Sequence, residues 1–348
     1  MKKNIPTTIS PASKKEFTDM RKKELRLAGQ KAAKSNPRPK LSVVIPVYNS
    51  KDIVGLTIDE TVLCGFKLGI PFEVIAVDDG SSDGSWGVLC KKVRQHESKI
   101  VAIKLLRNFG QHSALFCGIS FARGEWVLTL DDDMQIHPKE ITRLMAKASG
   151  EVDLVVGRFE QKRHGLIRRI GSNLVQKINQ QIFGKPNGFT VSSFRLIRRD
   201  VVDRILQYRT PFPYINGLML LCSGNRANVT VEHRERVTGS SGYGIKGIAS
   251  LLMKILFTYS AYPLRVALVL SMICSVASFS VGLYFIILKI IGDIHVEGWT
   301  TVVAMIAFFN SLLILMLAMI GEYVLRFFRQ VINEPAYHIS DVYKHHKN

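Results

Sequence analysis

The chain contains five apolar runs of strand length, separated by segments of helix length. The runs are apolar on both faces, which is typical of strands in a parallel sheet covered by helices on both sides. They read LSVVIPV, FEVIAV, IVAIKLL, EWVLTL and VDLVVG, and the helical segments between them include 85–96, 111–122 and 138–148. This alternation predicts an α/β fold with a mostly parallel, Rossmann-like sheet.

A polar cluster follows each of the first four runs. The clusters read PVYNS, DDGSSDGS, RNFGQHS and DDDMQ. In open α/β sheets, ligands bind at the carboxyl edge of the strands. The pattern therefore predicts that all four clusters belong to one binding site.

Three consecutive aspartates stand out in a chain whose formal net charge is +19. Adjacent carboxylates raise each other's pKa unless a cation compensates them. Asp131 and Asp133 are separated by one residue, so both can face one Mg²⁺ or Mn²⁺ ion, with Gln135 adding a neutral oxygen. The alternative is that Asp132 or Asp133 caps the helix that Pro138 opens.

Asp78 and Asp79 lie in the second cluster, within a turn rich in glycine and serine. Their carboxylates could accept hydrogen bonds from a nucleotide base or ribose. The alternative is a helix N-terminus with an Asx-turn.

Two long uncharged runs occupy the C-terminal third, at 266–288 and 298–321. Each exceeds the roughly 20 residues that a transmembrane helix needs. The basic residues that flank the two runs are Lys246, Lys254 and Arg265 on one side, and Arg326, Arg329 and Lys344 on the other. The positive-inside rule then places both termini and the large domain in the cytoplasm of a multi-pass protein of the cell inner membrane.

Composition adds limits to this prediction. The five cysteines are odd in number and scattered, which indicates reduced thiols. The first 40 residues are polar and rich in lysine, and they lack the apolar segment of a signal peptide. The predicted order is a basic arm (1–40), a catalytic-sized domain (41–235), a juxtamembrane interfacial segment (236–263), two transmembrane helices (264–326) and a cytoplasmic tail (327–348).

Together the motifs VVIPVYNS, VDDGSSDGS, RNFGQHSAL and LDDDMQIHPKEI resemble glycosyltransferase family 2, which has the GT-A fold. Within it, the polyprenyl-phosphate glycosyltransferases are the most similar subgroup. The segments VEHRERVTGSSGYG, GEYVLRFF and EPAYHI resemble the end of that subgroup, so the likeness runs over about 41–337.

The resemblance implies an inverting enzyme that moves one sugar from a nucleotide-sugar donor to a polyprenyl phosphate at the cytoplasmic membrane face. A UDP-sugar and undecaprenyl phosphate are the preferred substrates, and the product would feed cell-envelope glycan or lipid modification. The implied partners are the donor, the acceptor and the lipid bilayer, without nucleic acid, and a homo-oligomer is compatible with them.

The resemblance also assigns roles by position. The residues expected to bind the donor are Pro46, Tyr48, Val77, Asp79 and Asp132. The residues expected to be catalytic are Asp131 and Asp133, which with Gln135 hold the metal, and Arg236, which approaches the donor diphosphate.

The acceptor phosphate is expected to meet Arg158, Arg168 and Ser172. The hydrophobic pattern independently predicts an amphipathic helix suited to a membrane interface in the segment HGLIRRIGSNLVQKINQQIF. An ordinary surface helix packed on the sheet is the alternative. This chain departs from its relatives at Ser50, where many have glutamate, and at Gly242, where a lysine is expected. Lys246 is a candidate replacement for that lysine.

A phosphate monoester is already ionised near neutral pH, so this reaction needs no histidine base. Two other functions compete. A processive polysaccharide synthase would carry a Gln-x-x-Arg-Trp segment, and none of the three tryptophans lies in that context. A membrane scaffold or nucleic-acid-binding protein would explain the net charge but would leave the three aspartates unexplained.

Overall fold

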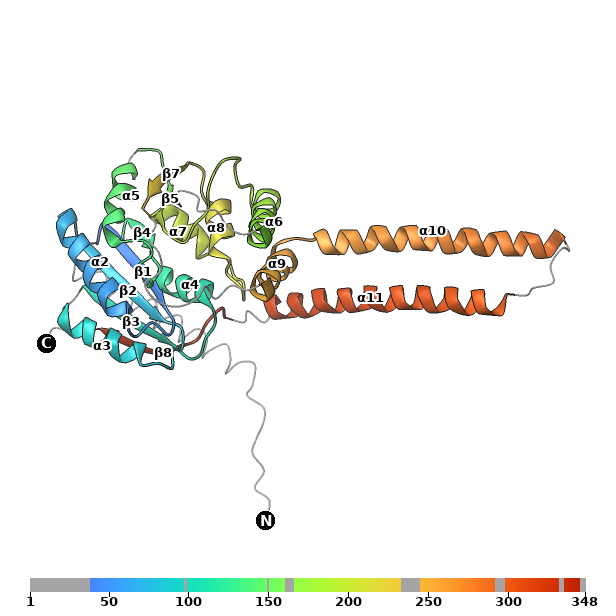
Figure 1. Ribbon diagram of the computed structural model, residues 1–348, viewed down its shortest axis with the longest axis horizontal. Helices are drawn as coiled ribbons and strands as arrows, with labels where there is room; N and C mark the ends of the chain where they lie inside the picture. The colour runs from blue at the N-terminus through green and yellow to red at the C-terminus, as the bar shows by residue number, and fades with distance from the viewer. Residues whose placement is uncertain are drawn as a thin grey trace, which may run out of the picture.

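The computed structural model describes residues 38–96, 99–148, 150–159, 166–232, 245–291, 298–331 and 335–344. Within these ranges the chain forms a head, in which a sheet lies between two layers of helices. Two long helices leave the head side by side (Figure 1).

One sheet of eight strands organises the head, in the order β7-β5-β6-β4-β1-β2-β3-β8. The strands are β1 (Leu41–Val47), β2 (Phe72–Asp78), β3 (Ile100–Leu105), β4 (Trp126–Thr129), β5 (Leu154–Phe159), β6 (Arg195–Arg198), β7 (Arg226–Val231) and β8 (Ile339–Lys344). The neighbours β4, β1, β2 and β3 run parallel, so their carboxyl ends share one edge. The α/β fold with a mostly parallel sheet is therefore confirmed.

Helices cover both faces because the central strands are apolar on both faces. Every residue of β1 and of β2 is buried. One face packs against α2 (Val54–Leu68), α3 (Ser85–Gln95) and α5 (Ile141–Lys147), which the short turn η1 (Pro138–Glu140) precedes.

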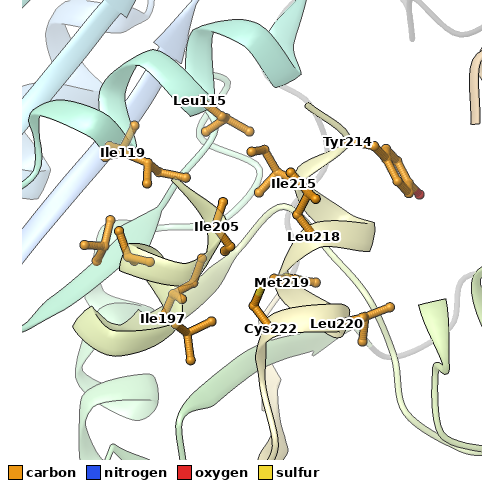
Figure 2. Close-up of a cluster of buried hydrophobic side chains, with 14 of the residues drawn as sticks. Leu115, Ile119, Ile197, Ile205, Tyr214, Ile215, Leu218, Met219, Leu220 and Cys222 are labelled. Carbon is orange, nitrogen blue, oxygen red and sulfur yellow. The ribbon is translucent and has the colours of Figure 1, made fainter. Parts of the chain in front are cut away.

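The opposite face packs against a second helical layer. It consists of α4 (Gln111–Phe121), α6 (Leu166–Phe183), α7 (Arg199–Ile205), α8 (Ile215–Cys222) and α9 (Ile245–Tyr259). Figure 2 shows its centre, where Leu115 and Ile119 of α4 lie near Ile197 of β6 and Leu218 of α8. This layer places α4, α6 and α8 around the carboxyl edge of the sheet.

Three strands, β6, β7 and β8, were not predicted from the pattern. β7 pairs parallel with β5 at one edge of the sheet. β6 inserts between β5 and β4 and runs antiparallel to both. β8 comes from the segment predicted as a tail and pairs antiparallel with β3 at the edge of the sheet. The Leu106 N–H donates to the His338 carbonyl at 2.9 Å, so the last described segment is joined to the head.

The first predicted transmembrane run falls within α10 (Tyr262–Ile291), and the second, apart from Gly298, within α11 (Trp299–Val331). These are the two helices that project from the head in Figure 1. Over the described residues, no helix combines the length and the apolar character that a membrane crossing requires.

Glu73 on β2 is a buried anion that joins three segments of the head. Its side chain accepts hydrogen bonds from the Ser42 hydroxyl at 2.7 Å and from the Arg123 backbone N–H at 2.8 Å. The Arg123 guanidinium donates two more, at 2.7 and 2.9 Å. Because Glu73 is only 4 % exposed, its removal would leave these donors without their acceptor.

We expect Glu73→Ala to lower the free energy of unfolding by about 3 kcal/mol, within the range for breaking a buried ion pair. Denaturant unfolding of the purified protein measures this change. Glu125→Ala, an exposed glutamate directly before β4, is the matched control and should stay within about 0.5 kcal/mol of the parent. Equal losses in the two variants would contradict the assignment.

Candidate active site

The four polar clusters meet at the carboxyl edge of the sheet, and hydrogen bonds join them in pairs. The Asn49 N–H donates to the Ser81 hydroxyl at 3.0 Å, which links the first cluster to the second. The Phe109 N–H donates to Asp79 Oδ1 at 2.7 Å, which links the second to the third. Gln111 Nε2 donates to Asp131 Oδ1 at 2.7 Å, which links the third to the fourth.

Asp131 has both carboxylate oxygens engaged. Oδ1 accepts from Gln111, and Oδ2 accepts from the Ser193 hydroxyl at 2.5 Å. Burial raises the pKa of Asp131, and the neighbouring Asp133 raises it further, whereas Ser193 and Arg195 oppose the rise. The hydrogen bonds therefore hold this carboxylate in place, but together with Arg195 they do not fully stabilise its negative charge.

The Asp132 side chain has a different partner from Asp131, in the loop after β1. Its side chain accepts a hydrogen bond from the Ser50 hydroxyl, and its backbone carbonyl accepts one from Thr57 Oγ1 at 3.0 Å. Burial, together with Asp131 and Asp133, raises the pKa of Asp132 to about 6. Ser50, the departure from its relatives, thus contacts the acid cluster directly.

A divalent cation would relieve the crowding of charge at this edge. Asp131 and Asp133 interact electrostatically, and Gln135 follows at the same loop, where its N–H donates to Asp133 Oδ1 at 3.1 Å. Carboxylate and amide oxygens are the donors that Mg²⁺ and Mn²⁺ prefer, so this set fits such an ion. No cluster of three or more His, Cys, Asp or Glu side chains suited to a metal occurs among the described residues.

The capping alternative for Asp132 and Asp133 is wrong. The residue that caps η1 is His137, whose Nδ1 accepts from the Lys139 N–H at 3.1 Å. The aspartates precede it and point to other partners. The acid cluster is therefore not explained by the start of this helix.

The two aspartates after β2 differ in their free hydrogen-bonding capacity. Asp79 Oδ1 and Oδ2 accept from the backbone N–H groups of Phe109 and Gly110, at 2.7 and 2.9 Å. Burial, with Asp78 as a lesser cause, raises the pKa of Asp79 to about 6. Asp78 Oδ1 accepts from the Ser81 N–H, whereas its Oδ2 has no partner within the described part of the chain. Of the two aspartates, Asp78 thus carries the unpaired acceptor, and this oxygen is buried.

The other residues predicted to bind the donor differ in their exposure. Pro46 and Val77 face each other across β1 and β2, and both are buried in the sheet. Tyr48, which follows directly, is 50 % exposed. Of these three, only Tyr48 presents its side chain at the edge.

The backbone of the site is held in unusual conformations. Gly80 has φ +71°, and a Cβ there would lie 2.5 Å from the Arg107 carbonyl carbon, so only glycine fits between the second and third clusters. Asn49 and Met134 also adopt positive φ, at 50° and 55°. For a non-glycine residue this costs about 1 kcal/mol, and such strain concentrates at functional sites.

A cavity of about 630 Å³ opens beside Asp131. Gln111 and Ser193, the two residues that hold Asp131, form part of its wall. Three cationic side chains also line it, Arg158, Lys185 and Arg195, and no Asp or Glu does so among the described residues. A cavity of this charge next to the acid cluster is suited to an anion.

Arg195 is the most deeply placed of these cations, at 1 % exposed. Its guanidinium donates to Thr129 Oγ1 at 3.1 Å and to the Asn216 amide oxygen. Burial lowers the pKa of Arg195 to about 10, so the group remains charged at neutral pH, and Asp131 favours that charge. Arg195 therefore places a fixed positive charge between the acid cluster and the cavity.

Lys185 and Arg158 lie at other parts of the wall. Lys185 is 7 % exposed, and its Nζ donates to the Phe189 carbonyl at 2.8 Å. Arg158 is exposed at the end of β5. The predicted acceptor residue Arg158 thus lines the cavity, together with two cations that sequence reasoning missed.

His112 also lines the cavity but cannot serve as a cation there. Its ring packs edge-on against Phe212 and Tyr214. Burial, followed by the charges of Arg195 and Lys254, lowers the pKa of His112 to about 3. A pKa this low also makes His112 a weak base.

Several predicted residues lie outside what the structure describes. Arg236 and Gly242 fall in the segment 233–244, outside the described residues, and the side chains of Arg168, Ser172 and Lys246 are likewise not described. Their roles stay predictions. The missed residues Lys185 and Arg195 have no signal in the sequence that distinguishes them from other basic residues.

Part of the head matches a known protein family. Residues 42–206 match the family described as glycosyl transferase family 2. This range contains all four polar clusters, the acid cluster and most of the cavity wall. The chain therefore contains a glycosyltransferase family 2 domain and is a glycosyltransferase.

The solved structures that this chain resembles are distant from it in sequence. One is glucosyl-3-phosphoglycerate synthase from Mycobacterium tuberculosis with Mn²⁺, uridine diphosphate and glucosyl-3-phosphoglycerate, at 17% identity over 63% of this chain and 78% of that chain, with a TM-score of 0.46. Another is mannosyl-3-phosphoglycerate synthase from Rubrobacter xylanophilus, at 17% identity over 65% and 74% of the two chains, with a TM-score of 0.46.

Proposed function

We propose that this chain, a glycosyltransferase with a family 2 domain over residues 42–206, transfers one sugar from a nucleotide-sugar donor to the phosphate of a polyprenyl phosphate. The observation that supports the proposal best is the cationic cavity beside Asp131. Arg158, Lys185 and Arg195 face it, and its described wall has no acid. Such a cavity attracts an anionic acceptor to the place where the sugar leaves the donor.

The donor lies on the other side of the acid cluster. Asp78 offers a free buried carboxylate oxygen to a base or ribose, and Tyr48 is exposed nearby on the loop after β1. Asp131 and Asp133, with Gln135, hold a Mg²⁺ or Mn²⁺ ion in this proposal. When bound there, such an ion would supply positive charge to the departing nucleoside diphosphate. Arg236 approaches the same diphosphate, as the resemblance implies.

The acceptor phosphate attacks in line, which inverts the anomeric centre. A phosphate monoester is ionised at neutral pH, so no group must remove a proton from it. The residues of the cavity therefore act by position and charge, which orient the phosphate and lower the repulsion between it and the donor diphosphate. Arg158, Arg168 and Ser172 are the proposed contacts of that phosphate.

The lipid part of the proposal rests on the C-terminal helices. The uncharged runs 266–288 and 298–321 include residues whose side chains the structure does not describe, so their support comes from the sequence. Large apolar side chains are exposed along both helices; examples are Met272, Ile290, Phe308, Ile314 and Phe327. We propose that α10 and α11 are embedded in the cell inner membrane, with the head and both termini in the cytoplasm. Release of the protein from membranes by alkaline carbonate would contradict this.

The acceptor contact is tested by Arg158→Ala. We expect the KM for undecaprenyl phosphate to rise about tenfold, because the cavity loses a cation that attracts the phosphate. The KM for the nucleotide sugar should change less than twofold. Arg158→Lys should recover only part of the loss, since lysine keeps the charge but lacks the two-pronged geometry. Steady-state kinetics in detergent without anionic lipid measure both constants.

Arg209→Ala is the matched control, because Arg209 is exposed and does not line the cavity. If Arg158→Ala and Arg209→Ala have the same small effect, the phosphate does not bind at this cavity. If both raise the acceptor KM equally, a general attraction to the head is responsible, and the acceptor site is placed wrongly.

A further inference from the structure

The cavity beside Asp131 carries uncharged hydrogen-bonding groups as well as cations. Helix α6 contributes the amides of Gln176, Asn179 and Gln180 to its wall, and Asn216 contributes a fourth. Phosphate binding does not require this amide-rich surface, because the cations already supply donors. The amides therefore indicate a second kind of ligand group in the same cavity.

Asn179 is the member of this surface with an unmet hydrogen bond. It is 3 % exposed, and its Nδ2 donates to the Val175 carbonyl at 3.0 Å and to the Tyr214 hydroxyl at 3.3 Å. Its Oδ1 is buried and has no partner within the described part of the chain. A buried acceptor without a donor is costly, so a ligand that fills the cavity is expected to supply one.

That donor cannot come from the phosphates of the reaction. Ionised phosphate and diphosphate oxygens accept hydrogen bonds and have none to donate. A sugar hydroxyl can donate, and so can a protonated sugar amine. The charges of Arg158, Lys185 and Arg195 disfavour the amine, because like charges repel strongly where water is scarce.

The position of the cavity agrees with a sugar. Gln111 and Ser193 line the cavity and also hold Asp131, where the donor diphosphate is proposed to bind. A sugar attached to that diphosphate therefore extends into the cavity. There it lies between the leaving group and the acceptor phosphate.

We propose that Asn179 Oδ1 accepts a hydrogen bond from a hydroxyl of the transferred sugar, and that the cavity selects sugars without a cationic amino group. This inference rests on the proposed function, which places the donor diphosphate at Asp131 and its sugar in the cavity. It narrows the substrate class to nucleotide sugars with a neutral or acidic sugar.

The test compares ligands that differ by a single group. Isothermal titration calorimetry uses the full chain in detergent with Mn²⁺ and no acceptor, at about pH 6.5, where an amine of ordinary pKa is protonated. The probes are UDP, UDP-glucose and UDP-glucosamine, with GDP, GDP-mannose and GDP-mannosamine as a parallel series. In the series whose nucleoside diphosphate binds tighter, we expect the neutral sugar to bind about tenfold more tightly than the amino sugar.

Substitutions at Asn179 test the contact itself. Asn179→Leu keeps the volume but removes the acceptor, so the affinity for the neutral nucleotide sugar should fall about tenfold while that for the nucleoside diphosphate stays the same. Asn179→Asp keeps an acceptor and adds a negative charge, so it should bind the amino sugar more tightly than the parent does. Gln181→Leu, at an exposed position of the same helix α6 that does not line the cavity, is the matched control and should match the parent.

The outcomes separate this inference from the proposed function. The inference is overturned if the amino sugar nucleotide binds as tightly as the neutral one. It is also overturned if Asn179→Leu binds the neutral nucleotide sugar as much more tightly than the nucleoside diphosphate as the parent does. Thermal unfolding of each variant shows whether it folds, and if Asn179→Leu does not, the result with Asn179→Asp decides. The calorimetry contains no acceptor, so its result does not depend on which acceptor the enzyme uses. In a separate activity assay, a failure to glycosylate polyprenyl phosphate would contradict the proposed function but would leave the measured affinities unchanged.

Discussion

Replacing Asp131 with asparagine is expected to lower kcat by about a thousandfold or more while the protein remains folded. In our proposal Asp131 and Asp133 hold the ion that stabilises the leaving diphosphate, and the loss of that stabilisation costs about 4 kcal/mol or more. Asparagine keeps the size of the side chain and one acceptor oxygen for Gln111 or Ser193. Single-turnover rates with saturating donor and Mn²⁺ measure the effect.

Asparagine was chosen because it separates charge from shape. A residue that only accepts hydrogen bonds or caps a helix tolerates this change, since asparagine caps as well as aspartate does. The matched control is Asp203→Asn, an exposed aspartate paired with Arg199, and it should retain full activity. A variant at 131 with normal turnover would remove the metal from the proposed mechanism.

The second large effect is expected at Arg195. Arg195→Met removes a buried positive charge next to Asp131, and we expect kcat/KM to fall about a hundredfold. The free energy of unfolding should fall by only about 1–3 kcal/mol, because methionine fills the space but leaves the oxygens of Thr129 and Asn216 without their donor. Arg195→Lys should be intermediate.

The pH profile distinguishes this electrostatic role from a packing role. Arg195 favours the ionised form of Asp131 and so lowers its pKa. The loss of Arg195 therefore raises the pKa of Asp131. As the pH is lowered, activity that requires ionised Asp131 should be lost at a higher pH in the variant than in the parent. Arg198→Met, on the same strand but in a partly exposed pair with Asp200, should leave the profile unchanged. An unshifted acidic limb in Arg195→Met would show that Arg195 acts by packing alone.

The hydrophobic pattern predicted the parts of the fold that depend on local sequence. The first five strands and the helices between them form where the apolar runs place them, and the polar clusters meet because parallel strands end at one edge. β6, β7 and β8 were not predicted from the sequence, because the pattern of each is too weak to be recognised without its partners in the sheet. β6 is four residues long, two of them arginine, and β8 pairs with a strand more than 200 residues away in the chain.

The candidate site was predicted in outline, and its contacts were not. Asp131 and Asp133 were identified from their spacing, and Arg158 from the resemblance. Whether an oxygen is free or already bonded depends on packing between distant loops. For this reason the open acceptor is found on Asp78, and Asp79 instead holds the loop after β3.

The residues of the cavity wall show the same limit. Lys185 and Arg195 look like ordinary basic residues in the sequence, and only the fold brings them to one cavity with Arg158. Asn179 likewise falls on a helix whose pattern indicated an amphipathic surface. Its unpaired oxygen becomes visible only when α6 is packed against α8.

The central claim is the identity of the acceptor, and mass spectrometry of the product tests it most directly. The purified chain is incubated in detergent with Mn²⁺, a nucleotide sugar that it binds, and equal concentrations of undecaprenyl phosphate and 3-phosphoglycerate. We predict a polyprenyl monophosphate that carries one sugar, with release of the nucleoside diphosphate. A polyprenyl diphosphate sugar, a lipid with several sugars, or a glycosylated phosphoglycerate as the main product would contradict the account.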